Sequence, residues 1–173
     1  PPEGWPSVCA VIPARDEADA IGEAVGSLLR QDYDGAFQVI VVDDHSTDGT
    51  AEAARAAALA SKRADKLTIV PAAPLPAGWS GKVCAQSQGI AAARRLDFDA
   101  EYLLLTDADI AHPADALMQL VLRAGTERRD LVSLMVRLRC DSVWEKALIP
   151  AFVFFFAKLY PFAWVNDPRN RTA

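Results

Sequence analysis

With 173 residues, of which 51% are hydrophobic and 24% charged, the chain is long enough for one domain with a core and is not a disordered tail. Its net charge of −5, with the basic residues spread along the chain, argues against a nucleic-acid partner. Cys9, Cys84 and Cys140 are far apart and lack metal-ligand spacing, which argues against zinc. We expect reduced thiols, with Cys9 and Cys84 packed in the core.

The first half of the chain alternates apolar runs with helical patterns. Apolar runs predict buried strands at residues 8–12, 37–42 and 67–70. Between them, apolar residues at helical spacing predict a helix that ends near Arg30, and an alanine-rich stretch predicts a second helix that ends near Ala64.

The second half continues the alternation. A loop rich in proline and glycine at 71–81 precedes a predicted helix at 82–96, a short buried strand at 102–105, and a further helix at 114–128. Alternating apolar residues predict a last strand at 131–138. Strands that alternate with helices predict an α/β fold, with a mostly parallel sheet covered by helices on both faces.

The C-terminal segment has a different composition. Residues 147–157 carry no charge and are rich in phenylalanine, but they are too few to span a bilayer, which takes about 20. Two interpretations stay open, a membrane-interfacial or acceptor-side segment and a core helix of an incomplete C-terminal half. We therefore divide the chain into 7–140 and 141–173, and its start without methionine suggests a piece of a longer protein.

Two carboxylates, Asp107 and Asp109, directly follow the strand predicted at 102–105. In open α/β sheets the carboxyl ends of the strands form the ligand crevice. Two carboxylates in that position repel each other unless a proton or a cation relieves them, and Mg²⁺ or Mn²⁺ prefers such oxygen ligands. Taken alone, Asp-Ala-Asp is more typical of a strand-ending turn than of a metal site.

Polar loops at 13–17 and 43–48 follow two other predicted strands. Asp43 and Asp44 can accept hydrogen bonds from a base or a ribose, and Lys82 at a helix start can reach a phosphate. The alternative for the second loop is a helix N-cap formed by Ser46, Thr47 or Asp48. Together on one edge of a sheet, these loops predict a site for a nucleoside diphosphate and a metal.

A resemblance to family 2 glycosyltransferases with the Rossmann-like GT-A fold lies in the order of these motifs. They are Val-Ile-Pro-Ala-Arg-Asp-Glu (11–17), Val-Val-Asp-Asp-His-Ser-Thr-Asp-Gly-Thr (41–50), Gly-Lys (81–82) and Thr-Asp-Ala-Asp (106–109), and the resemblance covers most of residues 7–138. The Gly-Trp-Ser-Gly-Lys form at 78–82 and the Phe-rich segment ending Trp-Val-Asn-Asp-Pro at 164–168 resemble the hopanoid-biosynthesis-associated branch.

The resemblance implies a set of site residues. The donor-nucleotide pocket would be lined by Pro13, Ala14, Arg15, Glu17, Asp43, Asp44, Lys82, Asp107 and Ala108. Asp107 and Asp109 would form a DxD-type motif that holds Mg²⁺ or Mn²⁺, with Asp109 the direct ligand and Asp107 nearer the ribose. The metal would neutralise the leaving nucleoside diphosphate.

The implied activity is inverting, metal-dependent transfer of a sugar from a nucleotide-diphosphate donor, with a UDP-sugar favoured, to a lipid-like acceptor such as a hopanoid or polyprenyl compound. The resemblance places this domain, itself soluble, at the cytoplasmic face of the inner membrane. This chain carries Ser87 where many relatives have asparagine. The catalytic base is expected beyond Ala173, so this fragment is expected to bind donor and metal without turnover.

Other classes of protein remain as alternatives. A receiver-like signalling domain also gathers an acidic pair, a central aspartate and a lysine, but it carries the acidic pair after the first strand and the lysine after the central aspartate. A nucleotidyltransferase is expected to have a glycine-rich basic loop after the first strand, and residues 13–17 contain no glycine. A dinucleotide-binding domain requires a G-x-G-x-x-G motif, which the chain lacks. A non-catalytic nucleotide-binding domain stays open.

Overall fold

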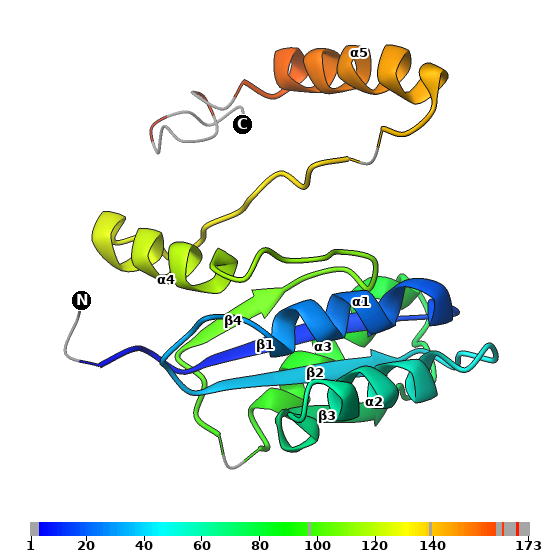
Figure 1. Ribbon diagram of the computed structural model, residues 1–173, viewed down its shortest axis with the longest axis vertical. Helices are drawn as coiled ribbons and strands as arrows, with labels where there is room; N and C mark the ends of the chain where they lie inside the picture. The colour runs from blue at the N-terminus through cyan, green and yellow to red at the C-terminus, as the bar shows by residue number, and fades with distance from the viewer. Residues whose placement is uncertain (1–3, 97, 139, 162–163, 165–168, 170–173) are drawn as a thin grey trace. The chain divides into compact units, whose positions relative to one another are not determined.

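The computed structural model describes residues 4–96, 98–138, 140–161, 164 and 169. The chain divides into two compact units, Pro1–Ser133 and Leu134–Ala173, and each is described by itself. Our functional division at residue 140 stays a prediction. The first unit contains β1 (Val8–Ala14), α1 (Ala18–Leu29), β2 (Phe37–Asp43), α2 (Thr50–Ala60), a 3₁₀ turn (Ala64–Lys66), β3 (Leu67–Pro71), α3 (Gly81–Ala93), β4 (Tyr102–Leu105) and α4 (Ala116–Glu127) (Figure 1).

The strands form a parallel sheet with the order β3-β2-β1-β4. Val8, the first residue of β1, pairs with Phe37 of β2 and with Tyr102 of β4. Every residue of β1 is buried, as expected for a central parallel strand that is covered on both faces. The chain adds β2 and β3 on one side of β1 and then returns to add β4 on the other. The carboxyl ends of β1 and β4 therefore form a topological switch point, where α/β sheets bind ligands.

Helices cover both faces of this sheet, as the sequence predicted. Because side chains alternate along a strand, Ala10 and Ile12 of β1 join one apolar cluster, whereas Val11 joins another. The first cluster includes residues of α1, α2 and α4, and the second includes Ala85 and Ala93 of α3. In Figure 1, α1 and α2 lie on the near side of the sheet and α3 on the far side.

Helix α3 packs very closely on the sheet because it presents a glycine there. A Cβ atom placed on Gly89 would overlap the Val11 side chain of β1 and lie 2.8 Å from Val42 Cγ2 of β2. Those valines are fully buried and β-branched, so they have little freedom to move aside. The glycine thus sets the spacing between α3 and the two central strands.

Helix α2 is shorter than its alanine-rich sequence predicts. It ends at Ala60, and Lys62 then adopts a left-handed φ of 54°. The Arg63 N–H donates to Ala58 O at 3.1 Å, the closing hydrogen bond that follows such a residue. A backbone cap, rather than loss of helix propensity, ends the helix.

Two strand predictions are wrong. Strand β4 was expected to be buried, but Leu103 and Leu105 are 42% and 47% exposed, because β4 is an edge strand of the described sheet and pairs only with β1. Residues 131–138 form no strand, and Leu134 and Val136 are exposed. Alternation shows which residues share one face of a strand, but a strand also needs a hydrogen-bonding partner.

The second unit contains α5 (Val143–Leu159), whose start is well specified. The Glu145 N–H donates to Ser142 Oγ at 3.2 Å, and the Ser142 N–H donates to Glu145 Oε2 at 2.7 Å, which is a capping box. No residue of α5 is buried. None of the helices that the structure describes combines the length and apolar character needed to cross a membrane. Residues 165–168, part of the motif that suggested the hopanoid branch, lie outside the described residues.

Candidate functional site

A cleft of about 390 Å³ opens at the switch point of the sheet. It collects the loop after β1, the end of β2, the start of α3 and the loop after β4. Its lining residues are Pro13, Ala14, Arg15, Glu17, Asp44, Gly81, Lys82, Ala85, Asp107, Ala108 and Asp109. Segments as far apart in the chain as Pro13 and Asp109 meet here, because the carboxyl ends of parallel strands lie on one edge of the sheet.

Asp43 is the one residue expected in the pocket that does not line this cleft. Its Oδ1 accepts a hydrogen bond from the Ser46 N–H at 3.1 Å, which closes the turn after β2. The Asp43 carboxylate therefore shapes the loop, while its neighbour Asp44 faces the cleft.

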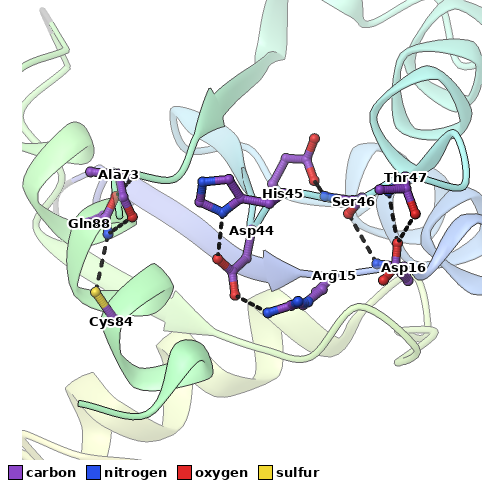
Figure 2. Close-up of polar contacts among 10 residues, drawn as sticks. Arg15, Asp16, Asp44, His45, Ser46, Thr47, Ala73, Cys84 and Gln88 are labelled. Carbon is purple, nitrogen blue, oxygen red and sulfur yellow. Dashed lines mark hydrogen bonds and ion pairs between the residues drawn. The ribbon is translucent and has the colours of Figure 1, made fainter. Parts of the chain in front are cut away.

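Asp44 is held between two basic side chains, as Figure 2 shows. Its Oδ2 lies 3.7 Å from Arg15 Nη1, and its Oδ1 lies 3.1 Å from His45 Nδ1. The Asp44 side chain is only 16% exposed, and its N–H donates to Ala14 O at 2.8 Å. His45 was not among the expected site residues. Its left-handed φ of 60° turns it back toward Asp44, and a histidine after an acidic pair in a tight turn is the only sequence signal for it.

On the opposite side of the cleft, Lys82 of α3 forms an ion pair with Asp107, with 2.7 Å between Nζ and Oδ1. Ala108 is buried, whereas Asp109 is exposed. Helix α3 begins beside Asp44, since a Cβ on Gly81 would lie 3.0 Å from Asp44 Oδ2. Its N-cap residue Ser80 makes no side-chain hydrogen bond to the first turn. The cleft thus combines carboxylates, cationic side chains and the positive end of a helix dipole.

The loops after β1 and β2 are joined by several hydrogen bonds. Figure 2 shows Asp16 between Ser46 and Thr47: the Asp16 N–H donates to Ser46 Oγ at 3.0 Å, and the Thr47 N–H donates to Asp16 Oδ1 at 2.8 Å. Further along, the Glu17 N–H donates to Thr50 Oγ1 at 2.9 Å. Arg15 and Glu17 of the cleft are therefore supported from the second loop.

Ser46, Thr47 and Asp48 were the three candidates for the cap of α2, and Asp48 is the one that hydrogen-bonds to the first residue of that helix. It precedes the N-cap Gly49 and accepts a hydrogen bond from the Thr50 N–H at 3.0 Å. It also accepts from the Ala18 N–H at 2.9 Å, at the start of α1. The hydrogen bond from the Thr50 hydroxyl, and after it the one from the Ala18 N–H, holds the pKa of Asp48 below its ordinary value.

The long loop before α3 is tied back to that helix. Gln88 Oε1 accepts from the Ala73 N–H at 2.7 Å, and Gln88 Nε2 lies 3.2 Å from Cys84 Sγ (Figure 2). Cys84 and Cys9 are buried, as predicted, and burial raises the pKa of the Cys9 thiol to about 11. Ser87 lines a groove beside this loop and not the cleft.

The cleft suits a divalent cation only together with a ligand. Among the residues that the structure describes, no three His, Cys, Asp or Glu side chains are grouped to hold a metal ion. Asp107 and Asp109 provide two carboxylates, and Mg²⁺ is typically bound by one or two carboxylates completed by substrate phosphates. The donor set therefore fits a cation whose coordination is completed by a phosphate.

A parallel α/β domain with a cleft of acidic and basic groups at its switch point has the architecture of α/β domains that bind their ligands there. A model of Glycosyl transferase family 2 matches residues 9–170, so the chain belongs to this family. This membership removes the receiver-like, nucleotidyltransferase and dinucleotide-binding alternatives.

Two curated relatives are similar over a short stretch. The succinoglycan biosynthesis protein ExoU of Rhizobium meliloti is 48% identical over 50 residues, which is 29% of this chain and 14% of that protein. An N-acetylglucosaminyltransferase of Mesorhizobium japonicum is 45% identical over 51 residues, which is 28% of this chain and 12% of that protein. The matches thus cover only a small part of each relative.

Two solved structures share the fold. A mannosyltransferase, PcManGT of Pyrobaculum calidifontis in complex with GDP-Man and Mn²⁺, has a TM-score of 0.54 and 31% identity, covering 69% of this chain and 32% of its own. TarS of S. aureus in complex with UDP has a TM-score of 0.54 and 22% identity, covering 70% of this chain and 33% of its own. The predicted GT-A fold is confirmed.

Proposed function

We propose that this chain is the donor-binding part of an inverting glycosyltransferase that transfers a sugar from a nucleotide-diphosphate donor to a lipid-like acceptor. The observation that carries the proposal is the cleft itself, which brings Asp44, Lys82 and Asp107 together at the switch point. Since the chain spans only about a third of the solved relatives, the activity of the whole protein forms part of the proposal.

The nucleoside would be bound on the β1 and β2 side of the cleft. Pro13 and Ala14 offer main-chain groups, and the Asp44 carboxylate offers hydrogen-bond acceptors for base N–H or ribose hydroxyl groups. Arg15 Nη1 lies 3.7 Å from Asp44 Oδ2 and orients that carboxylate. Glu17 lines the same side of the cleft. Asp43 would act through the shape of its loop, because its Oδ1 is engaged by Ser46.

The diphosphate would lie on the α3 and β4 side. Lys82 supplies a positive charge at the open start of α3, where the helix dipole also favours anions. Asp107 and Asp109, with Ala108 between them, would hold Mg²⁺ or Mn²⁺ with the phosphates. The metal would supply Lewis-acid stabilisation of the leaving diphosphate. Lys82 would add a second positive charge to the same leaving group.

A UDP-sugar is the donor that we favour, while the mannosyltransferase relative was solved with GDP-Man. Inversion requires a general base within hydrogen-bond reach of the acceptor hydroxyl. We assign no described carboxylate to this role, because those in the cleft face the nucleotide in our assignment. A nucleotide-binding domain without turnover is the remaining alternative.

We propose that α5 binds the acceptor, and we base this on the exposed side chains of that helix alone. This helix exposes Trp144, Phe152, Phe154 and Phe155 and carries Lys158 in its last turn. Exposed aromatics with a flanking lysine suit a lipid–water interface or a lipid-like acceptor, such as a hopanoid or polyprenyl compound. We therefore propose that the protein acts at the cytoplasmic face of the inner membrane.

The test is titration calorimetry of UDP and GDP with and without Mn²⁺, first on this chain and then on the full-length protein. We expect metal-dependent binding of one nucleotide, and Asp109→Ala should abolish the metal dependence. Asp65→Ala, which changes a carboxylate on the 3₁₀ turn away from the cleft, is the control and should bind like the wild type. If neither nucleotide binds to either protein, the proposed donor site is wrong. Unchanged binding by Asp109→Ala would exclude the metal assignment alone.

A further inference from the structure

A single carboxylate, that of Asp48, lies between the first residues of two helices. Its Oδ2 accepts a hydrogen bond from the N–H of Ala18, the first residue of α1, and its Oδ1 accepts one from the N–H of Thr50, the first residue of α2. The first N–H groups of a helix have no partner within the helix, and the helix dipole favours negative charge beside them. One side chain therefore stabilises the start of both helices.

Thr50 connects this carboxylate to the cleft loop. Its side chain is fully buried, at 0% exposure. The hydroxyl donates to Asp48 Oδ1 at 2.5 Å and accepts from the Glu17 N–H at 2.9 Å. Since a hydroxyl has one proton to donate and two lone pairs, both bonds form together. Two consecutive main-chain amides are thereby held: that of Glu17 by Thr50 of α2, and that of Ala18 by Asp48 in the loop before this helix.

The loops after β1 and β2 each contain one residue in a left-handed conformation. Asp16 and His45 adopt φ values of 53° and 60°, a left-handed conformation that residues with a Cβ disfavour. Conformations of this kind persist where surrounding contacts impose them, and they gather at functional sites. Here both residues adjoin cleft-lining residues, Asp16 between Arg15 and Glu17, and His45 next to Asp44.

Neither Asp48 nor Thr50 lines the cleft. We propose that Asp48, acting through Thr50 and the Ala18 amide, is a positioning residue that holds the Arg15–Glu17 loop in its cleft-lining conformation. The consequence for donor affinity rests on the proposed function, whereas the effect on the loop does not.

The experiment uses paired variants of the full-length chain. Asp48→Asn places an N–H₂ group or a weaker acceptor against the Ala18 N–H, and Thr50→Val removes the hydroxyl at nearly constant volume. Thr50→Ser keeps the hydroxyl and is the conservative rescue. Ser61→Ala is the structural control, because it removes a hydrogen bond to Ala57 O at the other end of α2.

The first readout is amide hydrogen exchange at Glu17 and Ala18. We expect faster exchange there in Asp48→Asn and Thr50→Val, and wild-type exchange in Thr50→Ser and Ser61→Ala. The second readout is nucleotide affinity in the presence of Mn²⁺. We expect the nucleotide affinity to fall by roughly 10- to 100-fold in Asp48→Asn and Thr50→Val. In Thr50→Ser and Ser61→Ala we expect it to remain near the wild-type value.

The two readouts test two separate claims, the positioning role of Asp48 and the donor site. Wild-type exchange at Glu17 and Ala18 in both disruptive variants would overturn the positioning role, and so would an equal loss of affinity in Ser61→Ala. If the wild type binds neither nucleotide, the donor site fails and hydrogen exchange still decides the role of Asp48. If Asp48→Asn does not fold, Thr50→Val and Thr50→Ser still test the positioning role. Equal amide exchange at Glu17 and Ala18 in these two variants would overturn it.

Discussion

Lys82 Nζ lies 2.7 Å from Asp107 Oδ1, so the start of α3 and the loop after β4 are joined by an ion pair on one side of the cleft. The two side chains are 61% and 48% exposed, and an ion pair in such a position adds little to stability. Its importance is positional, because it places a cation and a carboxylate where a diphosphate and its metal would be bound.

Lys82→Gln should weaken nucleoside diphosphate binding by roughly 10- to 100-fold, since a hydrogen bond to a charged group is worth about 1.5–3 kcal/mol. The melting temperature should change little, because the Lys82–Asp107 pair is largely exposed. Lys66→Gln, on the 3₁₀ turn, is the matched loss of one positive charge away from the cleft. Calorimetry with UDP and GDP measures the effect. Equal affinities for the two variants would remove Lys82 from the donor site.

Gly89→Ala should destabilise the protein, although alanine is the better helix former. Overpacking of a tight core costs about 1–3 kcal/mol, whereas the gain in helix propensity is about 1 kcal/mol. The new Cβ would overlap the Val11 side chain. Gly125→Ala in α4 is the control, because no atom lies within 4 Å of its Cβ position, and we expect it to be neutral or slightly stabilising. Urea denaturation of both variants measures the difference. Stabilisation by Gly89→Ala would show that α3 lies further from the sheet.

His112 should make stability depend on pH. Burial lowers its pKa from the ordinary value of 6.5, and Thr106 Oγ1 lies 3.0 Å from its Nε2. The folded state therefore binds this proton less readily than the unfolded chain. The stabilising contribution is complete above pH 6.5 and is lost as the pH falls below 6.5 toward the lower pKa of the folded state.

Denaturation between about pH 8 and about pH 5.5 measures this dependence, a range above that in which the Asp48 carboxyl titrates. His112→Gln should flatten the fall in stability below pH 6.5. Ser61→Ala, which removes no ionisable group, provides the control and should keep the wild-type slope. A wild-type slope in His112→Gln would assign the pH dependence to other groups.

The aromatic surface of α5 predicts binding to lipid. Phe154 and Phe155 are 70% and 59% exposed, and burial of one phenylalanine side chain is worth about 1.5–3 kcal/mol. The double variant Phe154→Ser and Phe155→Ser should therefore lower binding to phosphatidylcholine–phosphatidylglycerol vesicles at least roughly tenfold. Sedimentation with vesicles measures it, and Leu59→Ser, an exposed apolar residue of α2, is the control. Equal sedimentation of both variants would favour a core helix over an interfacial one.

The sequence predicted most of the elements because their patterns are local. The apolar runs that became β1 and β2 and the helical spacing of Ile21, Val25 and Leu28 depend only on which residues must be buried. The acidic loops could be assigned to one edge of the sheet, since all parallel strands present their carboxyl ends there. The order of strands and polar loops therefore predicted which loops meet at the cleft.

Only the tertiary structure decided properties that depend on partners distant in the chain. Asp43 and Asp44 are equivalent in sequence, but the turn after β2 engages the first with Ser46 and leaves the second facing the cleft. Residues 131–138 have the pattern of a strand without a partner, and exposed β4 residues show that burial follows from position in the sheet. The contact between Asp48 and the Ala18 amide spans 30 residues, and no local pattern encodes it. Local physics determines which element forms, while packing determines which of its side chains reach the site.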